Sequence, residues 1–218
     1  MNATDNVVAA CRVLIADDHP LYCDALRAVV PQASPGAHIG EAASQAEVLA
    51  AVTDDSSFDL VLLDLNLKGA VGLSCLAALR RVAPTTPVVV VSAVDDPKIM
   101  RQVILGGATA YVPKSAPRQV LINALRAILA GGSYMPAEVI TALREARAPQ
   151  PRGELTLRQK KVLGLLARGL SNKQIARTLE INEITVKAHV SAIYRKLGVA
   201  NRVQAGLEAR RFVDAPDP

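Results

Sequence analysis

Hydrophobic residues in the first 132 positions follow two alternating patterns. Five short runs rich in Val, Ile and Leu predict buried strands, namely CRVLIAD, HIGEAA, FDLVLLDL, PVVVVSAV and AYVPK. Between these runs apolar residues recur at helical spacing, as they do after Pro20, and Ser44 with Glu47 matches a capping box. Because uniformly apolar strands that alternate with helices form a parallel sheet covered on both faces, we predict a doubly wound five-stranded α/β domain over residues 10–132.

A different pattern starts after residue 132. The segment ARAPQPRG at 146–153 has the composition of a linker, and we predict a linker over 133–153 that includes a candidate short helix. Residues 154–212 predict a small all-α domain of four short helices with a tight turn near LEIN, which indicates a helix-turn-helix. The signals for the helix ends are N-terminal caps at Thr156, Ser171, Asn182 and Asn201 and C-terminal glycines at Gly169 and Gly198.

Charge separates the two predicted domains. Residues 1–132 hold 10 Lys or Arg and 12 Asp or Glu, whereas residues 133–218 hold 15 and 8. The net charge of +5 for the whole chain therefore comes from its second part. This asymmetry favours an anionic partner for the second domain, such as nucleic acid or a membrane surface. A solvated basic face would give the same counts, so charge alone does not decide between them.

Composition indicates the cellular setting. No stretch approaches the ~18 uninterrupted apolar residues of a transmembrane helix, and the N-terminal segment lacks the basic and apolar regions of a secretory signal. The three cysteines are widely spaced and do not have metal-ligand spacing, which indicates reduced thiols. We therefore expect a cytoplasmic protein without a membrane partner.

Polar residues follow four of the predicted strands. The first strand ends in Asp17 and Asp18, the third in Asp64, the fourth in Ser92 and the fifth in Lys114. The carboxyl ends of the strands in a doubly wound sheet meet at one edge, where ligands bind. Three carboxylates, a hydroxyl and an ammonium at one edge suit Mg²⁺ and phosphoryl chemistry, since Mg²⁺ takes oxygen ligands from carboxylates and phosphates.

Each of these residues also has an ordinary role when it is taken singly. An Asp after a strand usually caps a turn or a helix, and a Pro-Lys pair usually lies in a surface loop. Their joint occurrence favours a site in which a dication lies against Asp17 and Asp18 and Asp64 attacks phosphorus. A P-loop is excluded, because Pro113 precedes Lys114 and no glycine lies six residues before it.

The segment 183–197 predicts a helix that can enter a DNA groove. Val186, Val190, Ile193 and Leu197 share one face at about 100° per residue, opposite small and polar side chains. A major groove admits such a helix with its N-terminal residues near base edges, although a protein-binding module with a solvated polar face is the alternative. We predict base contacts by Thr185, Lys187, Ala188 and Ser191, and phosphate contacts by Tyr194, Arg195, Lys196, Ser171, Asn172 and Lys173.

Several segments together resemble a known family. VLIADDHPLY, DLVLLDLNLKG, VVVVSAVDD and GATAYVPKS look like a response-regulator receiver domain, which has a flavodoxin-like fold. LTLRQKKVLGLLARGLSNKQIARTLEINEITVKAHVSAIYRKLGV resembles the LuxR-type helix-turn-helix. In this order, over residues 11–210, they resemble two-component transcription regulators of the NarL/FixJ class.

The resemblance implies a phosphorylation-controlled DNA-binding transcription regulator. A sensor histidine kinase would supply the phosphoryl group, the unmodified receiver would mask the recognition helix, and the released protein would bind operator DNA as a homodimer. RNA polymerase is a further implied partner, and enzymatic activity would be limited to the receiver's own phosphoryl transfer and dephosphorylation. The implied residues are Asp64 as phosphoacceptor, Asp17, Asp18, Asp64 and the Asn66 carbonyl for Mg²⁺, and Ser92, Tyr111 and Lys114 as switch residues.

Four positions depart from the family pattern. Lys68 and Val71 stand where the family often has Pro and Asp, which adds a cation beside the site. Gln159 and Lys161 stand where the family usually has acidic residues, so an internal salt bridge of the second domain is expected to be missing.

Two other functions are compatible with parts of the sequence. Haloacid-dehalogenase-type phosphatases use a similar set of side chains but place a second acid two residues after the nucleophile, where this chain has Asn66. A regulator that works without phosphorylation, and keeps the receiver for dimerisation or protein contact, is the other alternative.

Overall fold

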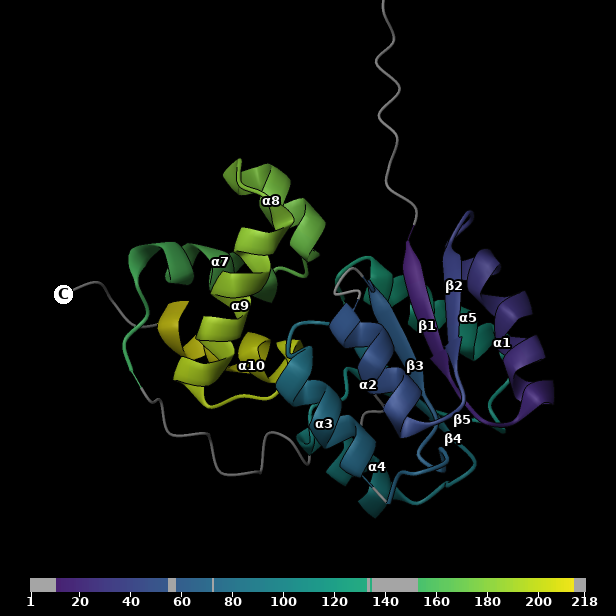
Figure 1. Cartoon of the computed structure of the whole chain (residues 1–218). Coiled ribbons are helices and arrows are strands. Elements are labelled where there is room, and N and C mark those ends of the chain that lie inside the picture. Colours follow the sequence, from purple (N-terminus) through teal and green to yellow (C-terminus); the bar gives the residue numbers. More distant parts are fainter. Residues whose placement is uncertain (1–10, 55–57, 72, 133, 135–152, 214–218) are drawn as a thin grey trace, which may run out of the picture.

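A computed structural model describes residues 11–54, 58–71, 73–132, 134 and 153–213, with only the backbone for 210–213 (Figure 1). The predicted short helix in the 133–153 linker lies outside the described residues. Two units form the described part, an α/β domain and a cluster of helices that lies beside it. The described helices include none that is long and apolar enough to cross a membrane.

The first domain is built on the predicted parallel sheet. All neighbouring strands pair in parallel, and the strand order is β2-β1-β3-β4-β5. The order reverses between β1 and β3, which is where a doubly wound sheet opens a site at its carboxyl edge. The strands are β1 (Arg12–Ala16), β2 (His38–Ala42), β3 (Leu60–Leu63), β4 (Val88–Ser92) and β5 (Ala110–Pro113).

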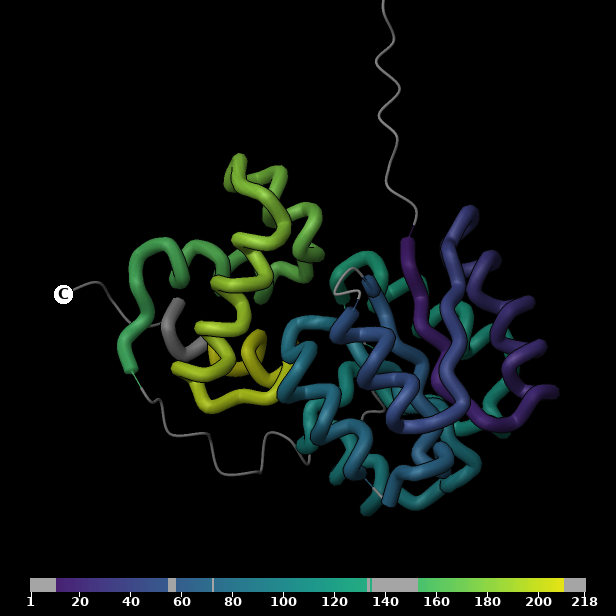
Figure 2. Tube along the Cα trace, viewed as in Figure 1, coloured from purple at the N-terminus to yellow at the C-terminus, as the bar shows by residue number. Residues whose placement is uncertain are grey.

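Helices cover both faces of the sheet, as predicted for uniformly apolar strands (Figure 2). One hydrophobic cluster joins the sheet to α1 and α5, and the other joins it to α2, α3 and α4. The strands β3 and β4 are buried along their whole length, because alternate side chains enter opposite clusters. The helices are α1 (Pro20–Ala33), α2 (Gln45–Asp54), α3 (Ser74–Val82), α4 (Pro97–Leu105) and α5 (Arg118–Leu129).

Four helices form the second domain around a hydrophobic core of their own. They are α7 (Leu157–Ala167), α8 (Asn172–Leu179), α9 (Glu183–Leu197) and α10 (Arg202–Val213). Thr156 and Ser171 form the predicted capping boxes of α7 and α8, and Asn182 caps α9 by accepting the Thr185 N–H. Glu180 ends α8 in the left-handed region at φ +53°, which makes the turn to α9 tight.

Candidate functional site

The carboxyl ends of β1, β3 and β5 bring an ammonium into contact with two aspartates. The Nζ atom of Lys114 lies 2.7 Å from Oδ2 of Asp17 and 2.9 Å from Oδ2 of Asp64. Backbone bonds that extend the sheet hold these residues, since the Asp64 N–H donates to the Ala16 carbonyl and the Lys114 N–H donates to the Ser92 carbonyl. The chain thus places residues 17, 64 and 114 together although they are far apart in sequence.

Burial makes this cluster electrostatically strong. Asp17 and Asp64 are only 4% and 3% exposed, so each carboxylate depends on the protein for partners. Burial by itself lowers the pKa of Lys114, but its close contacts with the Asp17 and Asp64 carboxylates raise it above the ordinary value. Lys114 also lies over the Tyr22 ring, 4.4 Å from its centroid, a cation–π contact that the sequence analysis missed. The ammonium therefore stays protonated.

The same edge holds a set of groups that can bind a metal ion. One ligand atom each from Asp17, Asp18, His19 and Asp64 lies within 4.8 Å of the others. The Oδ2 atom of Asp17 is buried, and its 2.7 Å contact with Lys114 is an ion pair without a directed hydrogen bond, which leaves it able to accept a further partner. Asn66 is exposed beside the set, and its N–H donates to Oδ1 of Asp64 at 3.3 Å. The donor set fits a hard divalent cation.

His19 joins this set without having been predicted. Its Nδ1 atom lies 3.1 Å from Oδ1 of Asp17 and 3.0 Å from Oδ1 of Asp18. The signal in the sequence was its position directly after the paired aspartates. The first turn of α1, which Pro20 opens, turns the imidazole back toward the carboxylates.

Ser92 and Tyr111 meet at the loop that follows β4. Ser92 is fully buried, and its Oγ accepts the N–H of Val94 at 3.3 Å. The Tyr111 hydroxyl donates to the carbonyl of the same Val94, and its ring is 1% exposed. The two predicted switch residues therefore bind the N–H and the carbonyl of the same residue, Val94, in the loop between β4 and α4.

The two departures near the site lie in an exposed loop. The Lys68 carbonyl accepts the Gln45 N–H at 2.9 Å, which ties this loop to the start of α2. Val71 is 85% exposed, and its N–H donates to the Ser74 hydroxyl at 2.9 Å. Hydrogen bonds of the backbone thus shape the loop that the family shapes with proline.

Most of the predicted DNA-contacting side chains in α9 are accessible. Ala188 and Arg195 are exposed, and Thr185, Lys187 and Ser191 are half-buried. Ala188, Ser191 and Arg195 lie on the side of α9 opposite the buried stripe of apolar residues, and Thr185 and Lys187 flank that side.

Tyr194 is a correction to the predicted phosphate contacts. Its side chain is 6% exposed, belongs to the core of the second domain and faces Arg80 of the first. Burial raises the pKa of its hydroxyl to about 12. A helical wheel of one segment could not show that Tyr194 is covered where the two domains meet.

Lys196 has partners within its own domain. Its Nζ donates to the Glu154 carbonyl at 2.8 Å and to Oε1 of Gln159 at 2.9 Å. Gln159 is also the second member of the α7 capping box. A neutral amide thus accepts a lysine proton at the position where the family has an acid, so a hydrogen bond replaces the expected salt bridge.

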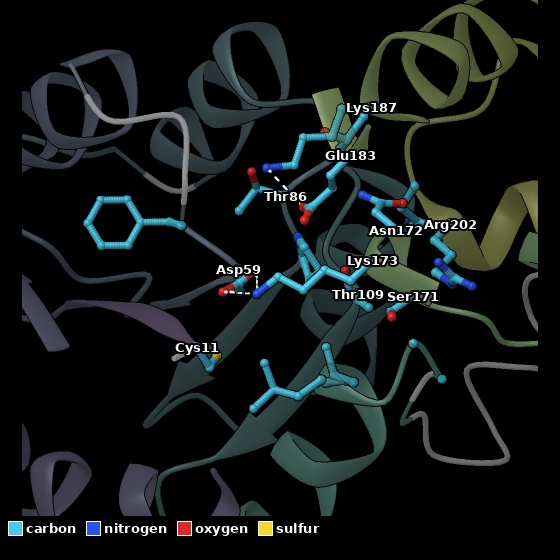
Figure 3. Close-up of a pocket in the computed structure, with 18 of the residues that line it drawn as sticks. Cys11, Asp59, Thr86, Thr109, Ser171, Asn172, Lys173, Glu183, Lys187 and Arg202 are labelled. Carbon is cyan, nitrogen blue, oxygen red and sulfur yellow. Dashed lines mark hydrogen bonds and ion pairs between the residues drawn. The ribbon is translucent and has the colours of Figure 1, made fainter. Parts of the chain in front are cut away.

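The predicted phosphate contacts at the start of α8 face the first domain. Ser171, Asn172 and Lys173 line a cavity between the domains, and Nζ of Lys173 lies 3.1 Å from Oδ1 of Asp59 (Figure 3). Lys187 of α9 lines the same cavity. In this structure these side chains are turned toward the first domain, and their contacts with DNA remain a prediction.

Comparison with known proteins shows which family each domain resembles. Residues 13–126 match the response regulator receiver domain, and residues 153–209 match the bacterial regulatory proteins of the luxR family. The chain is 43% identical to the glycerol metabolism activator of Pseudomonas putida over 91% of this chain and 94% of that protein. It is 37% identical to the nitrate/nitrite response regulator NarP of Escherichia coli, over 89% of this chain and 92% of that protein.

A solved structure shows the same fold over part of the chain. A LuxR family DNA-binding response regulator from Silicibacter pomeroyi has 32% identity and a TM-score of 0.51, over 58% of this chain and 98% of that one. Both domain matches and both full-length relatives agree with the two-domain order of the structure. The chain therefore belongs to the two-component response regulators that join a receiver domain to a LuxR-type DNA-binding domain.

Proposed function

We propose that Asp64 accepts a phosphoryl group from a sensor histidine kinase, and that this modification releases the second domain to bind operator DNA as a homodimer. The contact of the buried Asp64 carboxylate with the Lys114 ammonium, beside Asp17 and Asp18, carries this proposal. A carboxylate oxygen of Asp64 would form the new bond to phosphorus as the bond from phosphorus to the kinase histidine breaks.

Mg²⁺ is the cofactor that this cluster fits. Asp17, Asp18, Asp64 and the backbone carbonyl of Asn66 would hold it, and the bound ion would neutralise charge on the phosphoryl oxygens. Lys114 already contacts the nucleophile and can pair with a phosphoryl oxygen once the group is attached. The Ser92 hydroxyl, at the end of the neighbouring strand, can donate to another.

The site supports transfer to the protein itself better than turnover of external phosphoesters. Asn66 occupies the position where a phosphatase of similar geometry has its general acid, and an amide cannot protonate a leaving group. A steady-state assay on small phosphomonoesters should therefore give no turnover. Sustained turnover by the wild-type chain would favour the phosphatase alternative.

Contacts between the domains support an unmodified form in which the receiver holds the second domain. Asn201, at the start of α10, is 1% exposed, and its amide donates to the Ile104 carbonyl at 3.1 Å and the Ala108 carbonyl at 2.9 Å. Leu207 of α10 packs against a hydrophobic cluster of the receiver, and Lys173 pairs with Asp59. These contacts hold the start of α8 and part of α10 against the receiver.

A continuous set of contacts joins the phosphoryl site to this interface. If Ser92 turned toward a phosphoryl oxygen, its Oγ would no longer accept the Val94 N–H, and the loop that leads into α4 would move. Tyr111 holds the carbonyl of the same Val94 and would follow that loop. Since α4 ends beside Ile104, whose carbonyl binds Asn201, a shift of α4 would weaken the contact between the domains.

Once released, α9 would lie in the major groove. Thr185, Lys187, Ala188 and Ser191 would approach base edges, and Arg195 would meet a phosphate. The start of α8, with Ser171, Asn172 and Lys173, would bind a second phosphate through its helix N-terminus. RNA polymerase would be the partner of the DNA-bound form at promoters.

A DNA-binding titration tests the proposal. The full chain is measured against a fragment selected with the 150–218 segment, with and without acetyl phosphate and Mg²⁺. Affinity should rise on modification of the wild type and stay constant in Asp64→Asn, whereas Asp59→Asn should bind more tightly without modification because it loses the pair with Lys173. If Asp64→Asn retained full regulation, the phosphorylation-independent alternative would be favoured.

A further inference from the structure

Between the two domains lies a partly open cavity of about 340 Å³ that the proposed phosphorylation mechanism does not use. Figure 3 shows Lys173 of the second domain reaching across it to Asp59 of the first. The volume is at the lower end of the range of small-molecule sites, about 300–1,000 Å³. A ligand of that size would contact the receiver and the DNA-binding domain at once.

Basic side chains outnumber acidic ones around this cavity. Its lining includes four cations, Arg80, Lys173, Lys187 and Arg202, and two carboxylates, Asp59 and Glu183. The carboxylates are already paired, Asp59 with Lys173 at 3.1 Å and Glu183 with Lys187 at 3.4 Å. Among the described lining residues, the cations of Arg80 and Arg202 are therefore left without a carboxylate partner.

Arg80 is a cation of the cavity lining that lacks a carboxylate partner among the described residues. Its guanidinium donates to the Pro84 carbonyl at 2.9 Å and the Thr86 carbonyl at 2.6 Å, and its buried Nε has no hydrogen-bond partner within the described part of the chain. In the same part of the chain, no carboxylate forms an ion pair with it. The residue as a whole is half-buried, and a partly desolvated cation without a counterion is stabilised by a nearby anion.

The start of α8 adds a second anion-binding element. Its N-cap Ser171 and first residues Asn172 and Lys173 line the cavity, and the first-turn N–H groups of a helix favour a negative charge. Apolar side chains complete the wall, including Phe58, Ile128 and Leu129 of the receiver. Positive charge, helix amides and apolar surface together suit an anion with a carbon body.

We propose that this cavity binds a small organic phosphomonoester that bridges the domains and holds the protein in its masked form. The inference rests on the masking proposed above and adds a chemical signal to it. A ligand that binds only the closed form, at about 100 times its dissociation constant, would lower the open fraction about 100-fold. The chain would then require phosphorylation and a low level of this metabolite class to bind DNA.

Calorimetric titration of the full unmodified chain with phenyl phosphate, in buffer with chelator and without Mg²⁺, tests the site. Saturable binding is expected, with benzoate several-fold weaker because its carboxylate offers fewer acceptor oxygens. Lys187→Gln should raise the dissociation constant about fivefold and Glu183→Gln should lower it by a similar factor, since they remove opposite charges at one place. Lys160→Gln, on an exposed part of α7, is the charge-matched control and should change little.

The dissociation constant is expected to change in opposite directions in Lys187→Gln and Glu183→Gln. This contrast distinguishes binding in the cavity from nonspecific binding elsewhere on the basic protein. Absence of saturable heat, equal affinity in Lys187→Gln and Glu183→Gln, or equal affinity for benzoate would each overturn the inference. Phenyl phosphate should also weaken DNA binding by the full chain and leave the 150–218 segment unaffected. If DNA binding still responds to Asp64 phosphorylation while phenyl phosphate does not bind, only the cavity inference fails.

Discussion

Replacing Asn201 by Asp should release the DNA-binding domain without phosphorylation. The Asn201 side chain has two functions, since its amide donates to the Ile104 and Ala108 carbonyls of the receiver and its Oδ1 accepts the Gln204 N–H at 2.9 Å. Aspartate keeps an oxygen that can cap α10. It cannot donate, so it would place a carboxylate against two carbonyl oxygens in a buried position.

The magnitude follows from the two lost hydrogen bonds. Each is worth about 1 kcal/mol in net terms, so the closed form loses about 2 kcal/mol before any repulsion is counted. This corresponds to about a 30-fold change in the ratio of closed to open protein. The apparent DNA affinity of the unmodified chain should rise by up to that factor, limited by the affinity of the free domain.

Fluorescence anisotropy with a labelled operator fragment, in the presence of chelator, measures this effect. The same substitution in the 150–218 segment should leave affinity nearly unchanged, which checks that the α10 cap survives. Asn123→Asp, on the exposed face of α5, adds the same charge away from the interface. Unchanged affinity of full-length Asn201→Asp would refute the proposed role of this contact in masking.

Three further predictions concern separate parts of the chain. Mg²⁺ should raise the melting temperature of the wild type, because it offsets repulsion among the clustered carboxylates, and should raise that of Asp64→Asn by less, as scanning fluorimetry can show. Arg195→Gln should reduce the slope of log DNA affinity against log salt by about 1, whereas Lys196→Met should chiefly lower the stability of the second domain by about 1–2 kcal/mol, measured by urea denaturation. Burial raises the pKa of Cys11 and Cys75 to about 11, so both should react slowly with maleimide at pH 8 until the chain is unfolded.

Each of these predictions has a clear contrary result. An equal Mg²⁺ effect in the Asp64 variant would place the ion elsewhere. A salt slope that fell with Lys196→Met and not with Arg195→Gln would reverse the assignment of the phosphate contact. Fast labelling of the two native thiols would show that they are not protected by burial.

The sequence by itself determined the local elements and the side chains that make up the proposed phosphoryl site. The carboxyl ends of parallel strands meet at one edge of the sheet, so the sequence alone groups Asp17, Asp64 and Lys114. Capping residues act over three or four positions, and for that reason the starts of α7, α8 and α9 followed directly from the chain. Helix caps depend on residues close in sequence. The grouping of the strand ends depends on the sheet topology, which the alternation of strands and helices along the chain already specifies.

Only the tertiary structure decided which side chains the two domains share. Tyr194 was predicted to reach a phosphate but is buried facing Arg80, and the Asn201 amide serves the receiver as well as its own helix. The cavity between the domains likewise depends on residues from the whole length of the chain. Such contacts depend on the angle and distance at which two separately folded cores meet, and no periodicity within one segment carries that information.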